Sequence, residues 1–410
     1  MKKMLYVAAT LFAAGFVSCS ENSNDNLQGN NFNSEERVPI LFTVGNGRVD
    51  ITTRGTGAVG TGETSFWRGE NLNVYMFNKG TLDIAKDQDQ LDIFNNEVVL
   101  APEVASATNS GSVKYVGDKY YPTSGDYDFF AYHADDAIVE GNTPELNDDE
   151  TMYVVPVTID GTQDLMIAKA IPTAEDTVKL QQNVDENEYE LSYARAYSAY
   201  SARKDVQPNF IFQHLLSRLV FKIKPNSKND LAVSIEEVRI KNVNTTADFV
   251  VAWKGDTPES FLLDARNNDD VVLMEKNPEI DKAHPLLPFT PQSPRWNEED
   301  DEAYIDQLGE SMLLMPQDEY QLYILMEENG IRNHYEATIR PPKGGKFEAG
   351  YEYNVTFVVY GLEKIELNVA LEPWKLGDDI IADSDELKGD DENVTEEEEE
   401  EEEEDNEIIQ

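Results

Sequence analysis

Apolar and polar residues alternate over many short stretches of this chain. In Leu72–Phe77 and in Tyr351–Val359, successive side chains belong by turns to two faces, one of them apolar throughout. A period of two is typical of a strand that buries one face. Residues that favour turns, such as glycine, proline and asparagine, separate these stretches, and no long amphipathic helix pattern interrupts them. We therefore expect an all-β fold built of β-sandwiches.

The stretch around which we expect the other strands to be arranged is Phe210–Pro225. Its second half alternates as a half-buried strand, which Pro225 ends. Its first half is apolar on both faces, which predicts a passage through a core. His214 lies in this first half, and the sequence shows no catalytic partner for it. We interpret His214 as a hydrogen-bonded core residue rather than as a ligand or a base.

A hairpin is predicted where Tyr320–Glu327 and Ile331–Ile339 flank Glu328-Asn329-Gly330. Asparagine and glycine tolerate the positive φ angles that both central positions of a tight hairpin turn require. Between the hairpin and the preceding strands, Asp281–Asp306 is expected to be a long polar excursion. Further strands are expected at Val38–Val44, Tyr120–His133, Met152–Ile159, Asp164–Ala170, Val233–Val243, Phe249–Trp253 and Ile365–Leu371.

The start of the chain predicts export. A basic start is followed by an apolar run from Met4 to Val17, which is too short to span a membrane and is typical of a secretory signal. Phe16-Val17-Ser18-Cys19 places a small residue before a cysteine, which resembles a bacterial lipobox and implies that Cys19 is lipidated. An ordinary signal peptide with a chance cysteine is the alternative. Cys19 is the one cysteine in the sequence, so an intrachain disulfide is excluded.

Composition divides the chain into segments. Residues 1–18 are expected to be the lipoprotein signal peptide, and residues 19–36, which have little to bury, a flexible tether. A polar stretch ends near residue 205, where we expect a boundary between two domains. These domains are predicted at 37–205 and 206–377.

Acidic residues dominate the end of the chain. Residues 378–410 contain nine consecutive glutamates, Glu396–Glu404. Such a block repels itself and has no apolar face, so we expect a disordered acidic tail. The formal net charge of the whole sequence is −47 at pH 7. This charge argues against nucleic-acid binding.

No constellation of residues in the sequence predicts catalysis. The histidines lie far apart and a single cysteine is present, so no zinc-like cluster and no cofactor are expected. Asn147–Glu150 and Asn267–Asp270 are acidic enough to hold calcium but lack the spacing of a calcium loop, so we interpret them as solvated loops. Among the tryptophans, Trp296 lies in a polar segment and is the candidate for a sugar platform. Core positions are expected for Trp67, Trp253 and Trp374.

Several segments occur in an order that resembles the fimbrillin family of Bacteroidales, the subunits of type V pili. These segments are the lipobox, Thr52-Thr53-Arg54 after an early strand, Trp67–Tyr75, Asp164–Met166, Phe212–Ile223, Phe347–Val355 and Pro373-Trp374. The resemblance spans residues 1–378, and the acidic tail lies outside it. The family implies two transthyretin-like β-sandwich domains in tandem. It also implies an outer membrane lipoprotein precursor that is exposed at the cell surface or in the fimbria.

The resemblance also implies a mechanism of assembly. An arginine-specific protease would cleave after Arg54, with Arg48 as the nearby alternative, and the strand that precedes the cut would be displaced. That strand consists of Pro39, Ile40, Leu41, Phe42, Thr43 and Val44. A strand from another pilus subunit would then fill its place. The implied partners are other pilus subunits, the protease, the outer membrane through the lipid, and a host or bacterial surface receptor.

A monomeric lipid-anchored glycan-binding surface protein is the alternative function. Both functions predict β-sandwiches and no enzyme activity, so the fold does not separate them. The acidic tail contains few apolar residues and is unlike a donated strand, which leaves the role of a pilus subunit as stalk, tip or anchor open. Stable polymers at the cell surface favour the pilus subunit, whereas a lone monomer that binds glycan favours the alternative.

Overall fold

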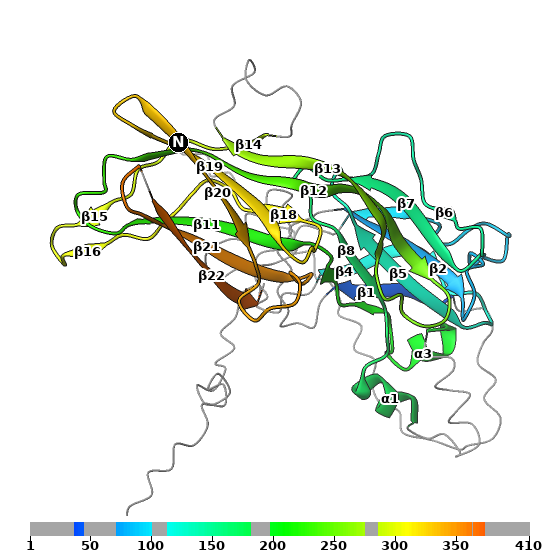
Figure 1. Ribbon diagram of the computed structural model, residues 1–410. Helices are drawn as coiled ribbons and strands as arrows, with labels where there is room; N and C mark the ends of the chain where they lie inside the picture. Colours follow the sequence, from blue (N-terminus) through cyan, green and yellow to red (C-terminus); the bar gives the residue numbers. More distant parts are fainter. Residues whose placement is uncertain are drawn as a thin grey trace, which may run out of the picture. The chain divides into compact units, whose positions relative to one another are not determined.

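The computed structural model describes residues 37–44, 71–100, 113–181, 197–274, 286–362 and 364–373, which Figure 1 shows as coloured ribbon. Val38 begins the compact unit that holds all of the strands below. Among these residues the helices are short, namely α1 (Ala174–Gln181) and α3 (Ala199–Arg203). The prediction of an all-β fold built of β-sandwiches is confirmed.

Two sheets enclose the first core. The smaller has the order β4-β1-β9 and consists of Val113–Tyr120, Pro39–Val44 and Asn209–Phe210. The larger has the order β10 (Gln213–His214), β8 (Met166–Lys169), β5 (Tyr127–His133), β2 (Asn71–Asn78) and β3 (Glu97–Leu100). Side chains from both sheets meet in one buried cluster, to which Phe42, Val74 and Phe129 belong. We call this cluster the first core.

Two further sheets enclose a second core, to which Phe221, Ile240 and Phe357 belong. One sheet has the order β17 (Asp306–Gln307), β11 (Ser217–Pro225), β21 (Tyr351–Val359) and β22 (Ile365–Pro373). A further short strand, β18 (Met312–Leu314), pairs with β11. The other sheet has the order β14 (Leu286–Pro288), β13 (Leu262–Met274), β12 (Ser234–Trp253), β19 (Tyr320–Glu328) and β20 (Ile331–Ile339). Beside β12 lies β7 (Met152–Thr158), and beside β7 lies β6 (Glu145–Leu146).

Strand β12 is the longest strand described, with 20 residues. The prediction of separate strands at Val233–Val243 and Phe249–Trp253 is wrong, because β12 continues through both. A bulge at Asn242, whose φ is 54°, shifts the register without ending the strand. The first half of β12 pairs with β19 and the second half with β7, as Figure 1 shows.

A third core lies against the second half of β12. It gathers Phe249 and Trp253 of β12 with Tyr132 and Phe130 of β5 and Val155 of β7. Tyr132 and Phe249 meet edge to face, with ring centroids 5.7 Å apart. Strand β5 is therefore buried on both faces, one toward the first core and one toward the third. The pairing of β7 with β12 crosses the predicted boundary near residue 205, and that boundary remains a prediction.

The stretch Phe210–Pro225 is not one strand. It forms the end of β9, then β10, then β11, because it passes from one core to the next. Phe210 and Phe212 lie in the first core, Leu215 and Leu216 in the third, and the alternating residues from Leu219 onward in the second. The expected passage through a core is confirmed. The chain does not stay in one continuous strand, however, because it changes sheets as it passes from core to core.

The other local predictions had mixed outcomes. The hairpin of β19 and β20 is confirmed, with Asn329 and Gly330 at φ angles of 54° and 81°. The polar excursion over Asp281–Asp306 instead contains β14, which pairs with β13, and the hairpin of β15 (Trp296–Asn297) and β16 (Glu302–Ala303).

His214 has a partner that the sequence did not reveal. Its Nδ1 lies 2.8 Å from Oδ2 of Asp164, and the two side chains are 8% and 2% exposed. The backbone N–H of Asp164 in turn donates to Asp135, which pairs with His133. The prediction of a hydrogen-bonded core histidine is confirmed, whereas the inference that it lacks a partner is wrong.

Replacement of His214 by glutamine is expected to lower the free energy of unfolding by about 1–3 kcal/mol, because Asp164 loses the donor that compensates its burial. His334→Gln, at an exposed position of β20, is the matched control and should change the free energy of unfolding by less than about 0.5 kcal/mol. Urea unfolding followed by circular dichroism measures both. Equal stability of the two variants would contradict a structural role for His214.

Candidate functional site

Strand β1 is the central strand of the smaller sheet of the first sandwich. It pairs antiparallel with β4 from Pro39 to Val44, with a bulge between Pro39 and Leu41. On its other side it pairs in parallel with β9, at Thr43 and Val44 only. Proline is compatible with the first position of β1, because its missing N–H interrupts no ladder of hydrogen bonds there. The strand is thus fully paired along one side and partly paired along the other.

The inward side chains of β1 are buried completely. Ile40 is 0% exposed and Phe42 is 2% exposed, and both belong to the first core. The ring of Phe42 meets that of Phe210 edge to face at a centroid distance of 5.4 Å and that of Phe94 at 6.2 Å. Burial of each such side chain contributes about 1.5–3 kcal/mol, and each favourable ring pair adds about 0.5–1.5 kcal/mol. Side-chain burial is therefore a large part of what holds β1.

Polar groups hold the N-terminal half of β1. The backbone N–H of Tyr121 donates to the carbonyl of Val38 at 2.9 Å. The side chain of Gln207 bonds to the main chain of Leu41 and Pro39 at 3.3 and 3.4 Å. No pattern in the sequence pointed to Gln207, which lies 166 residues from Leu41 along the chain.

Removal of β1 would open the first core. Because β1 is central, its loss would leave β4 and β9 without their shared neighbour. The space of Ile40 and Phe42 would become an apolar groove lined by Phe94 and Phe210, with unpaired backbone groups along its sides. Such a groove accepts an extended segment, since a strand supplies both main-chain bonds and alternating side chains.

Most of the other predicted site residues lie outside the described residues. These are Cys19, Arg48, Arg54, Trp67 and Trp374. Trp253 lies in the third core, 5% exposed, as expected for a core residue. Trp296 is half-buried on the hairpin of β15 and β16, where its indole N–H donates to Asp301 and Lys228 lies 5.7 Å from the ring centroid.

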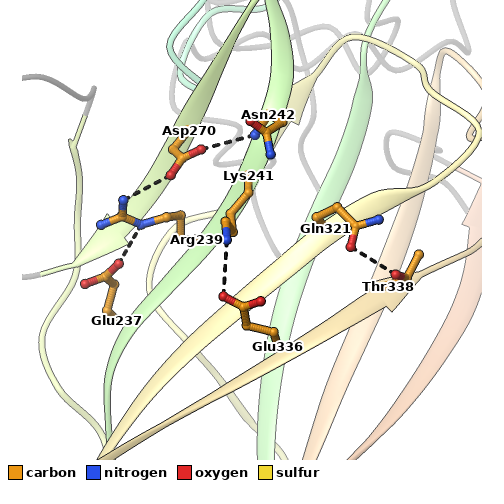
Figure 2. A network of polar contacts seen from close by, with 8 residues as sticks. All are labelled: Glu237, Arg239, Lys241, Asn242, Asp270, Gln321, Glu336 and Thr338. Atoms are coloured by element: carbon orange, nitrogen blue, oxygen red, sulfur yellow. Dashed lines mark hydrogen bonds and ion pairs between the residues drawn. The ribbon is translucent and has the colours of Figure 1, made fainter.

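The two acidic stretches take part in local bonding. Asn147 Oδ1 accepts from the backbone N–H groups of Thr151 and Met152, which closes a turn. Asp270 lies between Arg239 and the backbone N–H of Asn242 on the sheet of β12 and β13, as Figure 2 shows. Within the described ranges, no group of three or more histidine, cysteine, aspartate or glutamate residues is arranged to hold a metal ion.

The polar network of Figure 2 continues across the same sheet. Lys241 pairs with Glu336 at 3.1 Å, and Thr338 donates to Gln321 at 3.0 Å. The ion pair of Lys241 and Glu336 reaches from β12 across β19 to β20, whereas Gln321 and Thr338 join the neighbouring strands β19 and β20. These side chains are largely exposed, so each pair contributes little to stability. We interpret this face as a solvated sheet surface with paired charges. As to membranes, none of the helices in the described part of the chain is long and apolar enough to span one.

Comparisons with known proteins identify one matching family and several similar structures. A family model described as fimbrillin-like matches residues 53–374. A candidate cell adhesion protein from Bacteroides uniformis is similar in structure, with 17% identity, a TM-score of 0.45, and coverage of 83% of this chain and 99% of that one. The fimbrial anchor protein Mfa2 from Porphyromonas gingivalis is also similar, with 11% identity, a TM-score of 0.33, and coverage of 82% and 99%. No curated protein matches the sequence significantly.

The match to the family model carries the assignment, because it covers well over half of the sequence and includes every strand from β2 to β22. Strand β1 lies before the matched range. The chain belongs to the fimbrillin-like family.

Proposed function

We propose that the protein is the precursor of a type V pilus subunit in which strand β1 is exchanged for a strand of another subunit. Membership in the fimbrillin-like family supports a pilus or adhesive subunit at the cell surface, structural rather than enzymatic. The single observation that carries the exchange is the position of β1, which is central in its sheet, buried through Ile40 and Phe42, and paired with β9 over two residues only.

The proposed route begins with export. The signal peptide of residues 1–18 is removed and Cys19 is lipidated, so the precursor is held at the outer membrane. An arginine-specific protease then cleaves after Arg54, in a glycine- and threonine-rich segment that follows β1 in the sequence. Exposed segments of small residues are the preferred sites of proteolysis. The cut separates β1 from the remainder of the chain, and the strand leaves with the lipid.

The remainder then accepts a strand from another subunit. The incoming strand needs an apolar residue at the position of Ile40 and a large one at the position of Phe42, since those side chains fill the first core. In this proposal the two transthyretin-like domains, at 37–205 and 206–377, form the body of the subunit. The acidic residues 378–410 stay outside the sandwiches, and a host or bacterial surface receptor is a further partner. No cofactor takes part.

Phe42→Ala is expected to lower the free energy of unfolding of the uncleaved precursor by about 3–5 kcal/mol, because it leaves a cavity between Phe94 and Phe210. Leu41→Ala is the matched control on the same strand, where the side chain is half-buried, and should have a smaller effect. Urea unfolding measures both variants. If the two lower stability equally, β1 is not held by its inward side chains.

Arg54→Ala is expected to keep the protein in its longer, lipidated, monomeric form, because the strand is not cut loose. Arg48→Ala, in the same segment, is the control and should polymerise normally. The readouts are electrophoresis of unboiled cell-surface fractions, N-terminal sequencing and labelling with a fatty-acid analogue.

Three results would overturn parts of this proposal. Normal trimming and polymerisation of Arg54→Ala would show that Arg54 is not the switch. Persistent lipid labelling of Cys19→Ala would show that the anchor lies elsewhere. A wild-type protein found only as a monomer that binds glycan would favour the lipid-anchored glycan-binding protein.

A further inference from the structure

The main chain of β9 stops short of the N-terminal half of β1. Pairing begins at Asn209, and the residue before it, Pro208, is buried and has no N–H to continue a ladder. One residue further back, Gln207 offers a side-chain carboxamide, which carries the same donor and acceptor as a peptide group. Its Nε2 donates to the carbonyl of Pro39 at 3.4 Å, and its Oε1 accepts from the N–H of Leu41 at 3.3 Å. The side chain thus replaces a stretch of main chain beside β1.

The orientation of this carboxamide is set by its surroundings. Tyr121 donates its hydroxyl to the same Oε1 at 3.3 Å, so the amide nitrogen faces Pro39. Burial raises the pKa of Tyr121 well above its ordinary value, which keeps the hydroxyl a neutral donor. The residue before Gln207, Val206, is fully buried in the first core, and its N–H donates to the carbonyl of Ser201 at 3.0 Å. Gln207 therefore lies between two buried neighbours, Val206 and Pro208.

We propose that Gln207 is a latch for strand β1, which holds the N-terminal half of the strand in place and sets the rate at which the cleaved strand leaves. This inference rests on the proposed strand exchange. The two bonds to β1 are long, and Gln207 is only half-buried, so rotation of one side chain releases Leu41 and Pro39 together. The deeper contacts of Ile40 and Phe42 with the first core would then be the next to break.

The first test is hydrogen exchange at single-residue resolution on the uncleaved chain. In Gln207→Ala, the hydrogen-exchange rate of the Leu41 amide should rise about tenfold, which corresponds to the loss of about one hydrogen bond. Gln207→Glu keeps an acceptor for Leu41 but cannot donate to Pro39, so its rise should be smaller. Gln213→Ala replaces an exposed glutamine of β10 and is the matched control, with no change expected.

Two results of this test would overturn the latch. One is an unchanged rate at Leu41 in Gln207→Ala. The other is an equal acceleration at Phe129 in β5, on the opposite sheet, because that would mean a general loss of stability rather than local release of β1.

The second test uses the cleaved protein. After treatment with an arginine-specific protease, the half-life of the retained N-terminal fragment should be about tenfold shorter in Gln207→Ala than in the wild type or in Gln213→Ala. Equal half-lives would overturn the latch. If the protease does not cut after Arg54, the proposed function fails, and the exchange rates of the uncleaved chain still decide whether Gln207 holds β1.

Discussion

The burial of Ile40 and Phe42 in the first core is the interaction on which the behaviour of this protein depends. Both side chains come from the strand that is cut from the rest of the chain in the proposed function, yet they occupy the centre of a sandwich. Their burial, with the edge-to-face contacts of Phe42, outweighs any single hydrogen bond of the ladder, which is worth about 0.5–1.5 kcal/mol. If β1 is cut as proposed, these contacts would retain it until a better or more concentrated strand replaces it.

The rest of the fold explains how the body would survive while the groove is empty. The larger sheet of the first sandwich is buried on both faces, because Phe129 faces the first core and Phe130 and Tyr132 face the third. The third core also contains Phe249 of β12, a strand that continues into the second core. Loss of β1 would leave these contacts in place. The opened groove would consequently be a stable acceptor rather than the start of unfolding.

Local patterns predicted much of the fold and part of the site. Alternation located β2, β11 and β21, and the Asn329-Gly330 pair predicted the hairpin of β19 and β20, because these signals depend on neighbouring residues alone. Strands β4 and β13 were missed. Within β13, Asp264 to Asp269 are all exposed, so no apolar alternation marks that strand in the sequence. The continuity of β12 was missed for a related reason, because a bulge shifts its alternation. The partners His214–Asp164 and Leu41–Gln207 join residues 50 and 166 positions apart, a separation that no local pattern reports.

The most direct test of strand exchange is the composition of the assembled subunit. Polymers purified from the cell surface can be dissociated and analysed by intact mass and N-terminal sequencing. Strand exchange predicts a subunit that begins at Gly55 and contains no peptide from Pro39–Val44. Polymers whose subunits retain Pro39–Val44 would contradict it, because the groove would then still hold its own strand.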